Sequence, residues 1–279
     1  MNEMNFSIER NGRCSAMSLK NLMPLLAALA CALTFNLVLI ASAAADCGGA
    51  LLGQGRVTQV VDGRTLRLAD GREIRLTGIV PPSDATTAKA VLTALVANRD
   101  VVLRGDNDAP DRYGRQHALV VQAGTDTSVH TSVQVELLRA GAVLVTGTGL
   151  TTDCATELTA AETFAHQAGQ GLWASPDVIK NAESPDDILA MLGRFALVEG
   201  KVLSARQSGA TFYLNFGRHW VRDFAVIIPR QMIGSLARDG IDVKALAGRR
   251  VRVRGWIEQR GGPRIQLRGT GQIEVLDRR

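Results

Sequence analysis

The chain has 279 residues, of which 46% are hydrophobic and 21% are charged, and its formal net charge is +5. This length accommodates two domains, and the sequence has no low-complexity segment and no short repeat. Its four histidines and four cysteines are scattered, without a C-x-x-C or H-E-x-x-H motif, which excludes the common zinc-binding spacings.

The N-terminus has the pattern of a secretory signal peptide. A basic residue precedes the apolar run 22–40, and small residues follow, with an A-x-A-like cleavage site after Ala43 or Ala45. We therefore predict a signal peptide over 1–45, and a mature chain that is periplasmic or secreted and has no transmembrane span. An uncleaved membrane anchor is the alternative, since about 20 apolar residues can cross a bilayer. Met17 is an alternative start.

Two cysteines, Cys47 and Cys154, remain after the predicted signal peptide. An even number of cysteines in an oxidising compartment predicts one disulfide, which would join the mature N-terminus to a distant helix. By the chain-entropy relation, closing a loop of about a hundred residues stabilises the fold by about 4–5 kcal/mol. Two free thiols are the alternative.

The first part of the mature chain is predicted to be rich in strands. Short runs of alternating residues are divided by the turn dipeptides Asp62-Gly63 and Asp70-Gly71. The predicted elements are strands within 55–80, a helix over 85–98, strands over 101–105 and 117–123, and helices over 132–143 and 154–174. Five strands with appended helices indicate a mainly β fold of the α+β kind, built on an OB-fold barrel.

A connector over 175–193, rich in Pro, Ser and acidic residues, leads to a second strand-rich part. Ser184 and Pro185 suit the N-cap and first position of a short helix within the connector. The later predicted elements are strands over 195–206, 211–217 and 223–229, a helix over 230–240, and long strands over 249–259 and 264–276. We therefore predict a first domain over 46–174 and a second, OB-like five-stranded barrel over 194–279.

Charge is distributed unevenly, because residues 46–192 carry a net charge of −6 and residues 193–279 carry +10. A cationic C-terminal part favours an anionic partner. Aromatic residues interleave with cations in 211–224, as in proteins that stack bases and hold the backbone of single strands. We expect single-stranded nucleic acid or another polyanion to bind here, with a solvated outer face as the alternative. The expected contacts are Arg218, Trp220 and Arg222, then Arg252 and Arg254 on one strand and Arg264 and Arg268 on its partner.

Three motifs occur in order: V-D-G-x-T at 61–65, I-R-L-x-G-I at 74–79 and D-R-Y-G-R at 111–115. Together with G-L-W-A at 171–174, they make the segment 55–174 resemble the staphylococcal (thermo)nuclease-like proteins. The resemblance implies a calcium-dependent site that cleaves phosphodiesters. In that family two aspartates hold the metal, a glutamate activates water, and two arginines contact the phosphate.

The phosphate-contacting residues of the family are present in this sequence. Its two arginines correspond to Arg75 and Arg115, and the tyrosine beside the phosphate corresponds to Tyr113. Together with Arg64, these residues are expected to form a phosphate-binding pocket. The alternative is that the arginines are structural ion-pair partners of nearby aspartates.

The carboxylates of the family are missing. Its metal aspartates fall at Arg64 and Val80, and its general-base glutamate falls at Ser83, so we expect no metal or other cofactor. The favoured interpretation is an exported pseudonuclease that binds nucleic acid or another polyanion. One alternative is an active, calcium-dependent nuclease that uses a displaced acid such as Asp84. Another is an envelope interaction protein that uses its barrels as platforms.

Overall fold

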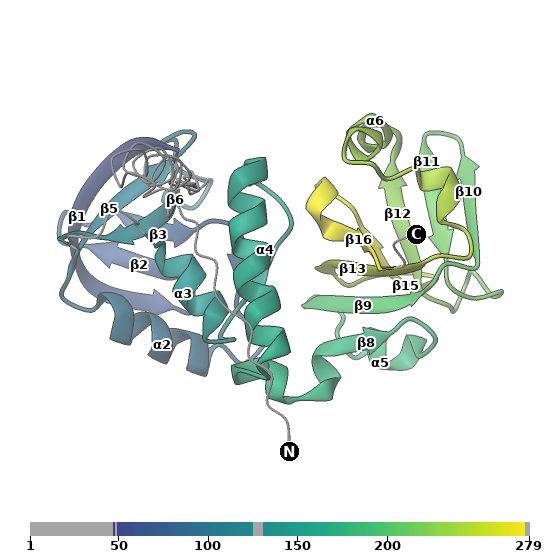
Figure 1. Cartoon of the computed structure of the whole chain (residues 1–279), viewed down its shortest axis with the longest axis horizontal. Coiled ribbons are helices and arrows are strands. Elements are labelled where there is room, and N and C mark those ends of the chain that lie inside the picture. Colours follow the sequence, from purple (N-terminus) through teal and green to yellow (C-terminus); the bar gives the residue numbers. More distant parts are fainter. Residues whose placement is uncertain (1–46, 48, 125–130, 277–279) are drawn as a thin grey trace, which may run out of the picture. The chain divides into compact units, whose positions relative to one another are not determined.

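A computed structural model describes residues 47, 49–124 and 131–276 (Figure 1). The predicted signal peptide over 1–45 and its cleavage site lie outside the described residues. Within the described part, no helix has the length and apolar character needed to cross a membrane. The described residues fall in one compact unit, 44–279, and the domain boundaries predicted at 174 and 194 stay predictions.

The first part of the described chain is a closed barrel. Its strands are β1 (Ala50–Asp62), β2 (Thr65–Leu68), β3 (Glu73–Leu76), β6 (Arg115–Gln122) and β5 (Asp100–Gly105), in that order around the barrel. Neighbours pair in antiparallel fashion except β3 and β6, which are parallel. Both predicted turns are present: Asp62 pairs with Thr65 across the first, and Asp70 accepts from the backbone N–H of Arg72 in the second. The prediction of a barrel here is confirmed.

Helices and a small sheet flank the barrel. They are α2 (Thr86–Val96), α3 (Val133–Arg139), α4 (Thr152–Gln167), and the pair β4 (Ile79–Val80) and β7 (Leu144–Val145). The side chains of Ser132 and Thr151 accept hydrogen bonds from the first turns of α3 and α4, which satisfies backbone donors that a helix start leaves open. The last predicted helix is shorter than expected, and a 3-10 helix over Gly171–Ala174 follows it.

Apolar side chains from the strands and helices fill the barrel. Leu66, Ile74 and Leu103 are fully buried with Leu92 of α2 and Leu137 of α3. The alternation read from the sequence places these strand residues inward, because successive side chains in a strand point to opposite faces.

The predicted disulfide is present. Cys47 and Cys154 are bonded across a sequence separation of 107 residues, so the start of the described chain is joined to the first turn of α4. Both residues are buried, with Leu119 of β6 beside them.

The C-terminal part consists of two sheets. The first has the order β10 (Ser204–Ser208), β11 (Thr211–Asn215), β12 (Ala225–Pro229), β15 (Gly262–Gln266) and β14 (Glu258–Arg260). The second has the order β16 (Ile273–Val275), β13 (Arg250–Trp256), β9 (Phe195–Lys201) and β8 (Ile179–Asn181). One apolar cluster takes residues from both sheets, among them Phe212, Val226 and Val251. Helices α5 (Pro185–Leu189) and α6 (Arg230–Arg238) complete this part.

The five-stranded second barrel stays a prediction. The two sheets are linked through the consecutive strands β9 and β10 and the consecutive strands β13 and β14, and β12 pairs in parallel with β15 as β3 does with β6. The long strand predicted over 264–276 is divided by a 3-10 helix over Thr270–Gln272, and its halves, β15 and β16, belong to different sheets. The predicted connector contributes β8, which pairs in parallel with β9. Its short helix begins after Ser184 with Pro185 at the first position, as predicted.

A buried ion pair joins α4 to β13. Arg254 Nη1 lies 2.7 Å from Glu162 Oε2 and also donates to the carbonyl oxygen of Val145 at 3.0 Å. The two side chains are only 7% and 6% exposed. Glu162 Oε1 accepts from the backbone N–H of Val145 at 2.8 Å. Buried charges are tolerated when they are paired and hydrogen-bonded, and both conditions hold here.

Replacing both bonded cysteines by serine should lower the free energy of unfolding by about 4–5 kcal/mol, because the unfolded chain regains the freedom of a loop longer than a hundred residues. Urea denaturation with and without reductant measures the difference. The wild type should lose stability on reduction, and the double variant should not respond. Equal stability of the oxidised wild type and the variant would contradict a stabilising disulfide.

The Glu162→Gln variant should lower the free energy of unfolding by about 3–5 kcal/mol, because the charge of Arg254 stays buried without its counter-charge. The amide oxygen of the glutamine still accepts from the backbone N–H of Val145, so the loss of stability measures the electrostatic part of the interaction. In the matched control, Glu162→Gln with Arg254→Met, both charges are absent while the amide oxygen still accepts from Val145, so most of the stability should return. A single variant as stable as the wild type in urea would show that Arg254 is not desolvated.

Candidate functional site

The turn between β1 and β2 organises the site. Asp62 Oδ1 accepts from the backbone N–H of Arg64 at 2.8 Å, and Asp62 Oδ2 accepts from the hydroxyl of Thr65 at 3.1 Å. These bonds fix the turn, and the Arg64 side chain then donates to the carbonyl oxygen of Ile79 at 3.2 Å. Arg75 lies next to this turn, because Thr65 pairs with Arg75 across β2 and β3.

Arg64, Arg75 and Arg115, which we call the arginine cluster, act on one another electrostatically. Burial first, and then the guanidinium of Arg75, lower the pKa of Arg64 to about 10, against a smaller opposing effect of Asp62. Burial and then the guanidinium of Arg115 lower the pKa of Arg75. All three groups are cations at neutral pH. The lowered pKa values of Arg64 and Arg75 thus reflect burial first and then repulsion between neighbouring guanidinium groups, which nearby carboxylates partly offset.

A tight loop holds Arg115. Arg115 Nε and Nη2 donate to Asp111 Oδ2 at 3.0 and 2.8 Å, and Asp111 Oδ1 accepts from the backbone N–H groups of Tyr113 and Arg115. These bonds, with the side-chain bond from Arg115 as the largest cause, hold the pKa of Asp111 well below its usual range. Gly114 adopts a φ of 78°, a conformation that suits glycine. The predicted alternative, a structural ion pair, is thus present for Arg115.

Arg75 differs from Arg115. Within the described residues, the guanidinium of Arg75 has neither a hydrogen bond nor an ion pair. The side chain is nevertheless half-buried, in the field of Asp62 and Asp111. The arginine cluster therefore contains one guanidinium, that of Arg75, whose hydrogen-bond donors are uncommitted. The cluster has three cations in all, with two carboxylates nearby.

Tyr113 is exposed beside the cluster. Its side chain is 64% exposed, and its ring carries guanidinium groups near its face, with Arg112 Cζ 4.7 Å and Arg115 Cζ 4.9 Å from the ring centroid. Arg112 Nη2 also donates to the Tyr113 hydroxyl at 2.6 Å. The loop thus presents an aromatic face and a further cation next to the cluster.

The residues at the positions of the family's acids do not fit a calcium ion. Val80 is buried among Leu144, Ala165 and Trp173, and Ser83 is exposed. Calcium takes six to eight oxygen ligands, usually with carboxylates among them. Within the described residues, no group of three or more His, Cys, Asp or Glu side chains is placed to hold a metal ion.

The candidate replacement acid, Asp84, is engaged in a different role. Its Oδ1 accepts from the backbone N–H of Thr86 at 3.1 Å and from the Thr86 hydroxyl at 2.6 Å. These hydrogen bonds lower the pKa of Asp84. The exposed carboxylate therefore forms a local turn with Thr86, the first residue of α2.

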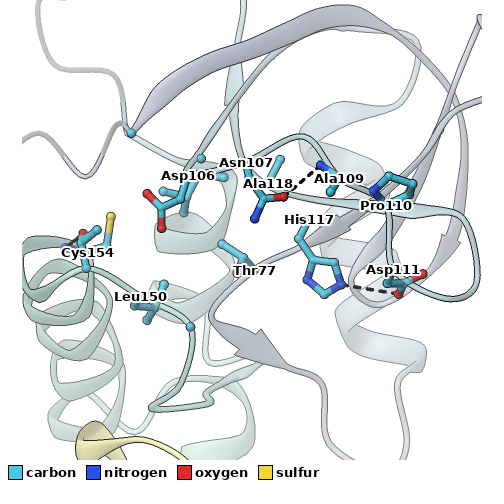
Figure 2. A pocket seen from close by; sticks show the side chains of 15 residues that line it. Thr77, Asp106, Asn107, Ala109, Pro110, Asp111, His117, Ala118, Leu150 and Cys154 are labelled. Atoms are coloured by element: carbon cyan, nitrogen blue, oxygen red, sulfur yellow. Dashed lines mark hydrogen bonds and ion pairs between the residues drawn. The ribbon is translucent and has the colours of Figure 1, made fainter. Parts of the chain in front are cut away.

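A cavity of about 590 Å³ lies next to Asp111 (Figure 2). Its polar lining includes Asp106, Asn107 and Thr77, and Cys154 of the disulfide also borders it. Figure 2 shows the imidazole of His117 directed toward Asp111, with Nε2 3.5 Å from Oδ2. Two carboxylates in the lining make this cavity unfavourable for an anion, so the candidate phosphate site is the arginine cluster, whose Arg115 is bonded to Asp111.

His117 was not among the predicted site residues. The signal that could have found it is its position two residues after Arg115 in one strand, which places both side chains on the same face. Both are within reach of the same Asp111 oxygen.

The arginines predicted on one C-terminal face are largely neutralised. Arg252 donates to Glu199 at 2.6 Å and lies 3.5 Å from Glu274, while Arg254 is buried against Glu162. The prediction that Arg264 and Arg268 share the sheet of Arg252 is wrong, because Arg264 is in β15 of the other sheet and Arg268 follows that strand in a bend. Both of those arginines are near Glu258, at 3.0 and 3.7 Å.

The remaining predicted contacts lie in an exposed loop between β11 and β12. Trp220 is 75% exposed, and Arg218 and Arg222 flank it in the sequence. Of the aromatic residues predicted around them, Phe212, Phe216 and Phe224 are buried in the C-terminal core.

Comparison with known families supports the assignment of the barrel. The profile of the family described as Staphylococcal nuclease homologue matches residues 74–175, a range that holds Arg75, Tyr113 and Arg115. The turn with Arg64 precedes it. A comparison with curated proteins gives no match. The closed barrel, the motif order and the family model agree that residues 74–175 form a domain similar to staphylococcal nuclease.

Proposed function

We propose that this chain is an exported nucleic-acid-binding protein that holds phosphodiesters at the arginine cluster without hydrolysing them. The observation that carries the proposal is the half-buried Arg75, whose donors are uncommitted between two further cations. A bound phosphate would accept hydrogen bonds from it and would offset the repulsion that, after burial, lowers the pKa of Arg64 and of Arg75.

The composition of the cluster favours phosphate over a single carboxylate. Guanidinium groups donate paired, planar hydrogen bonds that match phosphate oxygens, and a phosphodiester offers two such oxygens with one charge. The adjacent Tyr113 presents an aromatic face on which a base can stack. A nucleic acid supplies both groups from one chain.

The absence of hydrolysis is proposed from the side chains at the family's acid positions. A metal ion there would need carboxylates, yet Arg64 brings a positive charge and Val80 an apolar side chain. Without the metal and a general base, nothing prepares water for attack or offsets the charge on the phosphorane. The cluster then serves for binding alone.

Export is proposed from the disulfide and the N-terminal pattern. The bonded pair Cys47 and Cys154 suits an oxidising compartment such as the periplasm or the exterior of the cell. The envelope interaction protein considered from the sequence remains an untested prediction.

The Arg75→Ala variant should weaken binding of single-stranded DNA by about 1.5–3 kcal/mol, the value of a hydrogen bond to a charged group. Removing one of three neighbouring cations relieves repulsion, so stability in urea should stay equal or rise. Fluorescence anisotropy with a labelled oligonucleotide in EDTA measures affinity. Arg56→Ala is the matched control, since it removes an exposed arginine of β1 and the same charge. Equal losses in both variants would contradict a specific phosphate site.

Calcium should neither promote cleavage of labelled DNA nor change its affinity, because no carboxylates surround the cluster at the positions of the family's metal ligands. The Asp84→Ala variant should bind DNA normally and lose some thermal stability, since it removes the acceptor for the backbone N–H of Thr86 at the start of α2. Cleavage on gels that requires calcium and disappears in the Asp84→Ala variant would contradict the proposal and would support the active nuclease instead.

A further inference from the structure

The face of the five-stranded C-terminal sheet that lies opposite the apolar cluster carries a mixed row of side chains, in which Ile227 is buried and Tyr213 is partly exposed. Along β11 the burial alternates, with Phe212 and Leu214 buried and Tyr213 and Asn215 partly exposed. The strand register aligns a row across four strands: Arg206, Tyr213, Ile227 and Gln266. At about 4.8 Å between strands, this row is about 14 Å long. It offers an aromatic ring, an amide and a cation on one surface.

The loop over 217–223 begins and ends beside this row, because it joins β11 to β12. Asp223 organises it: Asp223 Oδ2 accepts from the backbone N–H of His219 at 2.7 Å, and the carbonyl oxygen of His219 accepts from Arg222 and Asp223. A Cβ on Gly217 would lie 2.0 Å from Asp223 Oδ2, so only glycine admits this carboxylate. The loop is therefore ordered in advance around an inward acid, while Trp220 points to solvent.

The turn between β14 and β15 packs against the same loop. A Cβ on Gly262 would lie 2.5 Å from the carbonyl oxygen of Asp223, which shows how closely the two backbones approach. The backbone of Gly261 likewise lies close to Val221 and Trp220, so Arg260 precedes a turn that packs on this loop. Within the described residues, neither Arg218 nor Arg260 has an ion-pair partner, and Arg222 lies 3.7 Å from Asp223.

We infer that this loop and the adjoining row form a second binding surface, which takes single-stranded nucleic acid. A base stacks on Trp220, Arg218, Arg222 and Arg260 contact the backbone phosphates, and the strand continues over Tyr213. The inference rests on the proposed function for the class of ligand, and it assigns binding to residues distinct from the arginine cluster. Because the loop is already ordered, little conformational entropy is lost on binding.

An anionic membrane is the competing partner for an exposed tryptophan among arginines. A membrane-binding loop buries apolar side chains in the lipid interface, with cations around them. Here Trp220 and Val221 are the exposed apolar residues, and the neighbouring face bears Tyr213, Asn215 and Gln266. Aromatic faces with amides and cations suit bases and phosphates better than acyl chains.

The test uses the full mature protein with labelled oligothymidylate and anisotropy as the readout. Trp220→Ala should raise the Kd about tenfold, equivalent to about 1.4 kcal/mol and within the range for loss of a stacked base. Trp256→Ala, which removes another exposed tryptophan, should leave the Kd unchanged. A Kd that is equal in the Trp220→Ala and Trp256→Ala variants would overturn the inference.

A second pair of variants tests the cations. Arg218→Ala combined with Arg222→Ala should reduce the slope of log K against log salt by about 0.7 for each phosphate that the protein no longer neutralises. Arg230→Ala combined with Arg238→Ala removes two arginines from α6 and serves as the control of equal charge. Equal slopes in the two double variants would contradict phosphate binding at the loop.

Fluorescence separates the two partners. In a Trp256→Phe background, oligothymidylate should quench the emission that Trp220→Ala removes, and vesicles of phosphatidylglycerol should not. A response to the vesicles alone would overturn the inference in favour of a membrane surface.

The proposed function at the arginine cluster and the proposed C-terminal surface can be refuted independently of each other. If Arg75→Ala weakens binding and Trp220→Ala does not, the C-terminal surface is refuted and the arginine cluster stands. If the reverse holds, the cluster is refuted and the C-terminal surface stands. If the wild type binds no oligonucleotide, both are refuted.

Discussion

The buried pair between Arg254 and Glu162 is the constraint on which the arrangement of this chain depends. An arginine at the centre of β13 has its charge and its donors satisfied by a glutamate and a carbonyl group from the part that follows the barrel. Because neither charge is tolerated alone in an apolar setting, α4 and β13 have to come together as the chain folds. The apolar cluster around Val80, Trp173 and Leu197 then closes over the same region. The ion pair supplies specificity, and the apolar contacts supply the favourable free energy.

Pairing of charges changes how the basic C-terminal part is interpreted. From the sequence, its many arginines predict a continuous binding face. In the structure, however, Arg252 and Arg254 form ion pairs with glutamates from another strand and from α4. The cations left over are in loops and at a sheet edge, where Asp223 and neighbouring glycines shape the backbone. The same distinction applies in the barrel, where Arg115 has Asp111 and Arg75 has no such partner among the described residues. Uncommitted donors locate a binding site better than the number of cations does.

Much of the barrel could be predicted from the sequence, because the residue patterns that specify its strands, turns and helix starts are local. Alternation sets the faces of the strands, Asp-Gly pairs set the turns, and hydroxyl residues cap the helices. The disulfide followed from cysteine number and compartment. The strand pairing of the C-terminal sheets was harder to predict. Paired strands there are distant in the sequence, and the residue pattern of a strand does not indicate which other strand it pairs with. Glu162 and Arg254 are 92 residues apart, and an Arg-Val alternation is the same whether the arginine faces water or a glutamate. For the site, the family motifs located Arg75 and Arg115. Whether each arginine is paired could not be predicted, because the ion pair of Arg115 with Asp111 and the lack of one for Arg75 depend on the folded backbone.

The strand β8, which comes from a segment with the composition of a connector, has a consequence for how the chain can be divided. It covers the edge of β9 over Ile179–Asn181 with backbone hydrogen bonds. A fragment that began at Phe195 would expose that edge, and an uncovered strand edge is a template for pairing with other copies. The same cut would separate Arg254 from Glu162. Aggregation of such a fragment would thus reflect both an open sheet edge and a buried charge without its partner. A C-terminal piece free of both defects would need to include α4 as well as β8.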